Sequence, residues 1–282
     1  MENKEELFHI PDWGDKAPDI FDMIGAKFPG REEFDVLFNP HNDKKRKLSE
    51  PKEEDKTAKT NNTPIDPNED ALLKGTRPFV LLNFGKPGSG KSELARYVAY
   101  EKWRTKAIDY IMVASSTPWT EDWGFIPKKA VKQWSEKLRS QIINFQNPET
   151  NKKRGHLLLV LEDPAGSFPW EDPENVKLII GHRHLNISVI ANLQYVYKIT
   201  PVYRECATNV AMFKQFTKRS KEALYDTYGG EFGRKEDFYK VLKDTTKEKY
   251  HFLYFQQALE PEEGRWSEAC ITPIPKDAKI KF

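Results

Sequence analysis

The chain contains little cysteine, no long apolar run and almost no net charge. Cys206 and Cys270 are the only cysteines among 282 residues, which argues against a disulfide framework and against a cysteine-based zinc site. No segment approaches the roughly 18 consecutive apolar residues that cross a bilayer. The N-terminus is acidic and lacks the apolar core of a signal peptide. We therefore expect a soluble protein of a reducing, intracellular compartment, with no membrane span.

The balance of charge also limits what the composition can say about partners. The chain has 45 basic and 43 acidic residues, which gives a net charge of +2, so the total does not by itself argue for a polyanionic partner. Its apolar content of 38% is low and its charged content of 31% is high for a globular protein. This composition predicts a compact core together with a solvated segment.

The distribution of residue types predicts three regions. Residues 1–39 carry scattered apolar groups between prolines and glycines, and we interpret them as an N-terminal arm that either docks on a partner or packs back on the domain. Residues 40–75 are strongly polar and predict a disordered linker. Within this linker, Lys44–Lys47 resembles a nuclear-import signal and equally fits a solvated charge run. Residues 76–282 form the third region, a predicted folded domain.

Short apolar runs alternate with helical patterns in this domain, which predicts an α/β fold with a mostly parallel central sheet flanked by helices. The predicted strands are residues 79–84, 108–114, 157–161, 187–191, 209–213 and 250–256. One helix is expected around residues 130–146. Its apolar stripe, which we interpret as core packing, consists of Val131, Trp134, Leu138, Ile142 and Phe145.

The clearest motif follows the first predicted strand. The sequence Gly85-Lys86-Pro87-Gly88-Ser89-Gly90-Lys91-Ser92 fits the pattern G-x-x-x-x-G-K-[ST], and a helix-like segment comes next. A strand, a glycine-rich turn and a helix together form a loop whose backbone N–H groups bind phosphates. We expect Lys91 to reach the β- and γ-phosphates of ATP and Ser92 to ligate Mg²⁺.

A second motif, residues 157–163, is an apolar strand that ends in two carboxylates, Glu162 and Asp163. The carboxyl end of such a strand lies beside the nucleotide in folds of this kind. One acid can hold the Mg²⁺ shell while the other activates the attacking water. By position alone we assign Glu162 to the metal and Asp163 to the water, although the order is the reverse of the more usual Asp-Glu.

Two later residues are candidates for catalysis. Gln194 ends another predicted strand and can sense the γ-phosphate or the lytic water. Arg204 lies in a predicted loop between two strands, from which it can face the nucleotide of a neighbouring subunit as an arginine finger. Arg183 and Arg219 compete with Arg204 for this role. A GTPase interpretation is set aside because no Asn-Lys-x-Asp-like element follows the Asp163–Gly166 motif.

In their order along the chain, these motifs resemble the genome-packaging ATPases of large eukaryotic DNA viruses. The resemblance lies in the phosphate loop, the strand ending in Glu162 and Asp163, the segment Arg183–Ile190, Gln194, and Pro201–Arg204, and covers residues 76–256. The viral packaging ATPases in question are of the poxvirus-like type, with virophage and Polinton relatives, within the FtsK–HerA superfamily of P-loop NTPases.

This resemblance implies a ring oligomer, expected to be a hexamer, that uses ATP and Mg²⁺ to move double-stranded DNA into a capsid with a capsid or portal component as partner. It places the protein inside an infected host cell, in a cytoplasmic viral factory or the nucleus, or in the virion. Two alternatives remain: a P-loop nucleotide kinase whose lid is residues 117–130, and an ATP-binding assembly scaffold without turnover. Candidate DNA contacts are Lys128, Lys129, Lys132, Lys214, Lys218, Arg219 and Lys221.

Overall fold

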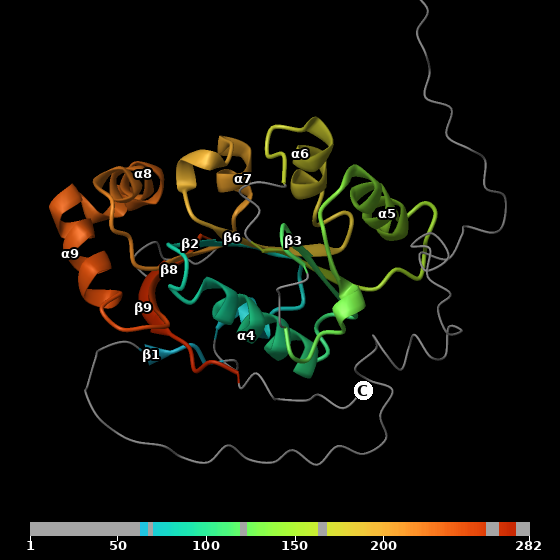
Figure 1. Ribbon diagram of the computed structural model, residues 1–282, viewed down its shortest axis with the longest axis horizontal. Helices are drawn as coiled ribbons and strands as arrows, with labels where there is room; N and C mark the ends of the chain where they lie inside the picture. The colour runs from blue at the N-terminus through green and yellow to red at the C-terminus, as the bar shows by residue number, and fades with distance from the viewer. Residues whose placement is uncertain (1–62, 67–69, 119–122, 163–167, 258–264, 275–282) are drawn as a thin grey trace, which may run out of the picture.

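The computed structural model describes residues 63–66, 70–118, 123–162, 168–257 and 265–274 (Figure 1). The predicted N-terminal arm, most of the predicted linker with Lys44–Lys47, and the acid Asp163 lie outside these residues. None of the described helices combines the length and the apolar character needed to cross a membrane.

The described strands form one nine-stranded mixed sheet in the order β1-β9-β8-β7-β2-β6-β5-β3-β4. Strands β7 to β9 are joined by antiparallel pairing, and all other neighbours are parallel. The strands are β1 (Thr63–Pro64), β2 (Val80–Phe84), β3 (Tyr110–Ser115), β4 (Val131–Lys132), β5 (Leu157–Glu162), β6 (Ile187–Leu193), β7 (Asn209–Met212), β8 (His251–Gln256) and β9 (Trp266–Cys270).

Helices cover both faces of this sheet (Figure 1). Helix α4 lies on one face and packs against the short α3, while α5 to α9 lie on the other face. The helices are α3 (Ala71–Lys74), α4 (Lys91–Arg104), α5 (Glu136–Gln146), α6 (Pro173–Ile180), α7 (Pro201–Cys206), α8 (Lys218–Tyr228) and α9 (Lys235–Thr245), with 3₁₀ turns η1 (Lys128–Ala130), η2 (Val196–Lys198) and η3 (Gly229–Phe232).

The central strand β2 shows why the sheet is buried on both faces. Its side chains alternate, so that Val80, Leu82 and Phe84 enter the core beneath α5 to α9 while Leu81 enters the core beneath α4. Strands covered on both sides contain almost only apolar residues. The exception in β2 is Asn83, which is fully buried and belongs to the site described below.

The structure confirms the predicted α/β fold and its mostly parallel sheet, with strands in all six predicted segments. The helix expected at residues 130–146 is wrong in its first third. Val131 belongs to β4 and pairs with Val113 of β3. Helix α5 begins only after Ser135, whose hydroxyl accepts a hydrogen bond from the N–H of Leu138 at 3.1 Å. A serine cap of this kind is a strong helix start.

The end of the predicted linker also differs from the expectation. Pro64 of β1 pairs with Cys270 of β9, and α3 inserts Leu72 and Leu73 into the core on the α4 side of the sheet. Residues 63–66 and 70–75 therefore contribute to the sheet domain. The polar composition hid this because Ile65, Leu72 and Leu73 are the few large apolar side chains that make the contact.

Candidate functional site

The glycine-rich loop follows β2 at the carboxyl edge of the sheet. The N–H of Gly85 donates to the carbonyl of Leu193 at 3.0 Å, which continues the β2–β6 ladder into the loop. A side chain on Gly85 would come within 2.7 Å of the Cβ of Phe213, so the close packing requires glycine. Gly88 and Gly90 have positive φ angles of 74° and 112°, which only glycine adopts without strain.

The start of α4 supplies the lysine and the serine of the motif. The Lys91 ammonium donates to the carbonyls of Gly85 at 2.7 Å and Lys86 at 2.9 Å, which holds its charge inside the loop. The helix begins at the same residue and has 14 residues. Its first N–H groups and its dipole therefore face the space in front of the loop, an arrangement that binds phosphate.

Ser92 connects this loop to the acid at the end of β5. Its hydroxyl donates to Oε1 of Glu162, while Oε2 of Glu162 accepts from the amide of Asn192 at 2.5 Å. Asn192 in turn accepts from the amide of Asn83 at 2.7 Å. The three strands β2, β6 and β5 thus bring one polar chain to the phosphate loop, and Glu162 is only 5% exposed. Asn83 and Asn192 had no role in our sequence interpretation, although each is a polar residue within an apolar strand.

The other predicted residues are distributed as follows. Gln194 follows Leu193, whose carbonyl accepts from Gly85, so this glutamine lies beside the first residue of the loop. Asp163 is outside the described residues, although its neighbour Glu162 is at the loop. The structure therefore brings Lys91, Ser92, Glu162 and Gln194 to one edge of the sheet.

Arg204 does not join them. It lies in the last turn of α7, not in the loop that we expected, and its guanidinium donates to the hydroxyl of Thr227 at 3.2 Å. Strand β7 begins soon after α7 ends, and Thr227 is in the last turn of α8. The start of β7 and the end of α8 both lie towards the amino edge of the sheet. Arg204 is therefore near that edge and away from the phosphate loop of its own chain.

The two competing arginines lie at opposite edges. Arg219 is in the first turn of α8, and its guanidinium lies 4.4 Å from the ring centroid of Tyr197, which follows β6 at the carboxyl edge. Arg183 precedes β6 and lines a cleft at the amino edge. Of the three arginines, Arg219 lies on the same edge as the phosphate loop.

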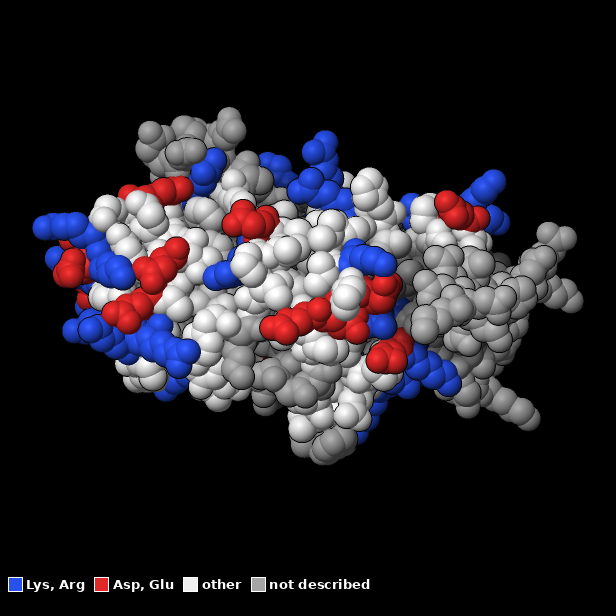
Figure 2. Space-filling view, turned by 90° about the horizontal axis from the view of Figure 1, so that it is seen from above, with Lys and Arg blue, Asp and Glu red and all other residues white. Residues whose placement is uncertain are grey.

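Charged residues on the helical face do not form a patch of one sign over α8 and α9. Figure 2 shows basic and acidic side chains alternating there. Lys218 lies 3.7 Å from the carboxylate of Glu222, and Lys235 lies 3.0 Å from that of Asp226. These ion pairs reduce the net charge that this surface presents to a nucleic acid.

A second buried polar cluster lies at the amino edge. The fully buried Lys102 of α4 donates from its ammonium to the carbonyl of Gly75. Burial lowers the pKa of Lys102 to about 8, although the charge of Asp70 opposes this shift. Burial raises the pKa of Asp70, whose carboxylate accepts from the N–H of Leu73 at 2.9 Å and caps α3. Burial also raises the pKa of Tyr254 well above its usual value.

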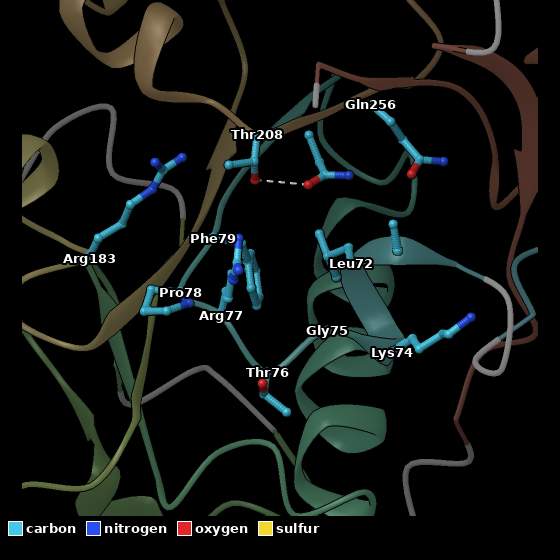
Figure 3. A pocket seen from close by; sticks show the side chains of 12 residues that line it. Leu72, Lys74, Gly75, Thr76, Arg77, Pro78, Phe79, Arg183, Thr208 and Gln256 are labelled. Atoms are coloured by element: carbon cyan, nitrogen blue, oxygen red, sulfur yellow. Dashed lines mark hydrogen bonds between the residues drawn. The ribbon is translucent and has the colours of Figure 1, made fainter. Parts of the chain in front are cut away.

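A cleft of about 700 Å³ lies next to this cluster (Figure 3). Figure 3 shows the side chains of Arg77, Arg183 and Thr208 around this cleft. The hydroxyl of Thr208 donates to the side-chain oxygen of Asn209 at 2.8 Å. The lining of the cleft contains three basic residues, Lys74, Arg77 and Arg183, and no acidic one. The other lining residues are Ala71, Leu72, Gly75, Thr76, Pro78, Phe79, Thr208, Asn209 and Gln256. Since the phosphate loop is at the other edge, this cleft is separate from the nucleotide site.

The residues at the carboxyl edge fit a nucleoside triphosphate with Mg²⁺. A hydroxyl and a carboxylate, from Ser92 and Glu162, supply the oxygen ligands that Mg²⁺ takes alongside phosphates and water. The hydroxyl of Ser89 is buried in the loop without a hydrogen-bond partner, and an atom added at Gly88 would meet nothing within 4 Å. The loop thus offers both donors and space. Together with the sheet order, it defines the fold of a P-loop NTPase.

Comparison with known proteins gives viral relatives in sequence. No protein-family profile matches the chain. It is 24% identical over 229 residues to the uncharacterized protein 015R of Frog virus 3 (isolate Goorha), covering 78% of this chain and 68% of that protein. It is also 24% identical over 204 residues to the uncharacterized protein 088R of Invertebrate iridescent virus 3, covering 71% of this chain and 75% of that protein.

Solved structures with a similar fold include two that contain an ATP analogue. The genome packaging NTPase B204 of Sulfolobus turreted icosahedral virus 2, in complex with ATP-gammaS, matches with a TM-score of 0.51 and 19% identity over 70% of this chain and 98% of that one. The pCW3 conjugation coupling protein TcpA, also with ATPgS, matches with a TM-score of 0.50 and 11% identity over 72% and 63%. These likenesses confirm the P-loop NTPase fold.

Proposed function

We propose that this chain hydrolyses ATP and uses the energy to package viral double-stranded DNA into a capsid. The observation that carries the proposal is the contact between Ser92 and Glu162, because it joins the phosphate loop to the acid of the neighbouring motif. Mg²⁺ held there would neutralise charge that develops on the transferred phosphoryl group. Lys91 binds the terminal phosphates, Asp163 activates water, and Gln194 positions it.

The similar structures support the DNA-moving part of the proposal. One is a viral genome packaging NTPase bound to ATP-gammaS, and another is a conjugation coupling protein. The sequence relatives are also viral. On this basis we place the protein in an infected cell, in a cytoplasmic viral factory or the nucleus, or in the virion, with a capsid or portal component as partner.

Phosphate release with and without duplex DNA tests this function. We expect hydrolysis by the full chain to rise with duplex DNA of any sequence and the stimulation to fall as salt increases, because backbone phosphates supply the affinity. Lys91→Ala is the matched inactive variant. ATP turnover that stays flat across a duplex titration at low salt would contradict packaging while leaving ATP hydrolysis intact.

We further propose that the subunits form a ring, expected to be a hexamer, in which Arg204 acts on the nucleotide of a neighbour. A head-to-tail ring contact joins two different surfaces of adjacent subunits, so an arginine far from its own loop can reach the next one. Arg204→Ala should bind ATP yet hydrolyse it about 10³-fold more slowly. Mixing with Lys91→Ala subunits should then restore part of the activity.

Two controls make this experiment specific. Thr227→Val removes the hydrogen-bond partner of Arg204 within the chain and should leave hydrolysis within about twofold, since the guanidinium remains. Arg219→Ala tests the competing arginine. No recovery in mixed rings of confirmed composition would remove Arg204 from the finger role.

The described part of the expected kinase lid argues for hydrolysis over phosphotransfer. Trp123, Phe125 and Ile126 are each at most 7% exposed and pack in the core beneath α4. A lid must open to admit an acceptor, and removing these side chains from the core would expose a large apolar area. Product analysis with ATP and mixed nucleotides checks this point: a phosphorylated acceptor in place of free phosphate would favour a kinase.

A further inference from the structure

The order of the strands fixes which end of a bound nucleotide lies where. Glu162 and Asn192 belong to β5 and β6, which lie on one side of β2, while β7 and β8 lie on its other side. If the terminal phosphate faces Glu162, the triphosphate crosses the loop and carries the nucleoside towards β7. The base must therefore contact residues that follow β7 or precede β8 at the carboxyl edge.

Phe216 is exposed in this region. Phe213, just after β7, packs under the loop, since a Cβ on Gly90 would lie 3.3 Å from its ring. Three residues later, Phe216 is 59% exposed, more than Ile180, the next most exposed of the large apolar side chains in the described ranges. The ammonium of Lys86, from the loop itself, lies 4.0 Å from its ring centroid. The side chain of Lys86 therefore spans from the phosphate loop to the ring of Phe216.

Another aromatic residue, Tyr250, borders the same part of the carboxyl edge and has a strained backbone. Tyr250 immediately precedes β8 and has a φ of 69°, which is unfavourable for a residue with a bulky side chain. Its ring packs against the loop, because a Cβ on Gly90 would come within 3.0 Å of Tyr250 Cδ1. Strained backbone that persists beside a binding loop is held there by its surroundings and is concentrated at functional sites.

We propose that Phe216 stacks on the base of the bound nucleotide, an inference that rests on the proposed ATPase function and assigns the base-binding part of its site. Aromatic rings stack on bases without reading their hydrogen-bonding edges. Lys86 and Lys214, whose ammonium groups lie 4.0 and 5.8 Å from the ring centroid, supply positive charge next to the phosphates. Because a purine has a larger ring surface to stack on Phe216, we expect purine nucleotides to bind more tightly than pyrimidine nucleotides.

The test compares ATP with inorganic tripolyphosphate, which shares the phosphates and lacks the base. In the full chain with Mg²⁺, Phe216→Ala should raise the dissociation constant of ATP about tenfold, equivalent to about 1.4 kcal/mol, and leave that of tripolyphosphate unchanged. Phe216→Trp should restore ATP binding. Ile180→Ala, an exposed apolar residue at the end of α6, is the matched control and should alter neither constant.

The outcomes separate this inference from the proposed function. An equal loss for both ligands, or no loss for ATP, would overturn the stacking role, and a change only in the oligomeric state would assign Phe216 to a subunit contact instead. Lys91→Ala should weaken both ligands. Wild-type protein that binds neither ATP nor tripolyphosphate would overturn the nucleotide site itself, whereas binding both with equal affinity would overturn only the base contact.

Discussion

The two edges of the central sheet both carry buried polar side chains, but they are built differently. At the carboxyl edge, Ser92, Glu162 and Asn192 come from three elements and meet beside the phosphate loop. At the amino edge, Asp70 caps α3 while Lys102 binds the carbonyl that follows the same short helix. In the function that we propose, the first set of contacts belongs to the nucleotide site, whereas the second fastens an N-terminal segment to the domain. We therefore expect substitutions at the carboxyl edge to affect hydrolysis and substitutions at the amino edge to affect folding.

Replacing the acid at each edge by its amide should give the largest difference in hydrolysis between the two edges. Glu162→Gln keeps the shape and removes the charge, so we expect hydrolysis to fall by about 10³-fold with little change in the melting temperature. Asp70→Asn is the matched variant at the amino edge, and its hydrolysis per folded molecule should stay within about twofold. Steady-state phosphate release and thermal unfolding measure both. A stability loss at Glu162 with activity retained would reverse the comparison.

Asn192 should show a smaller effect of the same kind. Its amide donates to the carboxylate of Glu162, and removing a contact that orients a metal ligand typically costs 10–100-fold in activity or metal affinity. We therefore expect Asn192→Ala to reduce hydrolysis by about 30-fold and to raise the Mg²⁺ concentration needed for half-maximal rate. An unchanged Mg²⁺ dependence would show that Asn192 is not an orienting residue.

The pH dependence of stability should report the amino edge. The pKa of Lys102 is about 8 in the folded chain against a usual 10.5, so the unfolded chain binds more protons between these values. The free energy of unfolding should thus rise by about 2 kcal/mol from pH 7 to 9.5. Urea unfolding across this range checks it. Lys102→Met should flatten the rise, whereas the exposed Lys243→Met should leave it unchanged.

The smallest predicted difference lies within the loop itself. Gly88 and Gly90 both have positive φ, so alanine at either position costs about 1–2 kcal/mol in backbone strain. At Gly90 the added Cβ also comes within 3.0 Å of Tyr250, whereas at Gly88 it meets nothing. Gly90→Ala should therefore be the more destabilising by about 1 kcal/mol in urea unfolding. Equal losses would show that Tyr250 can move away.

Local patterns made the loop and the central strands predictable. The glycine motif specifies its own turn, and the short apolar run Leu157–Leu161 favours a strand buried on both faces. The contact between Asn83 and Asn192 was not predictable, because it depends on the register of two strands 109 residues apart. Strand β9 was missed since Ser267 and Glu268 face solvent and interrupt its apolar character.

Lys102 shows the same limit at the other edge. A lysine near the end of a helix is normally expected to be solvated, and no neighbour in sequence indicates that it is fully buried. Its partner carbonyl at Gly75 belongs to a segment that we interpreted as linker. Only the packing of α3 against α4 brings the two together.

The hydrogen bond from Gly85 to Leu193 has a consequence for the thermodynamics of binding. Fixing the backbone of one free residue costs about 1–2 kcal/mol in lost conformational entropy. Because the loop begins as an extension of the sheet, folding has already ordered its first residue before any phosphate arrives. Affinity for the triphosphate is then set by contacts and charge, with little loss of freedom at the root of the loop.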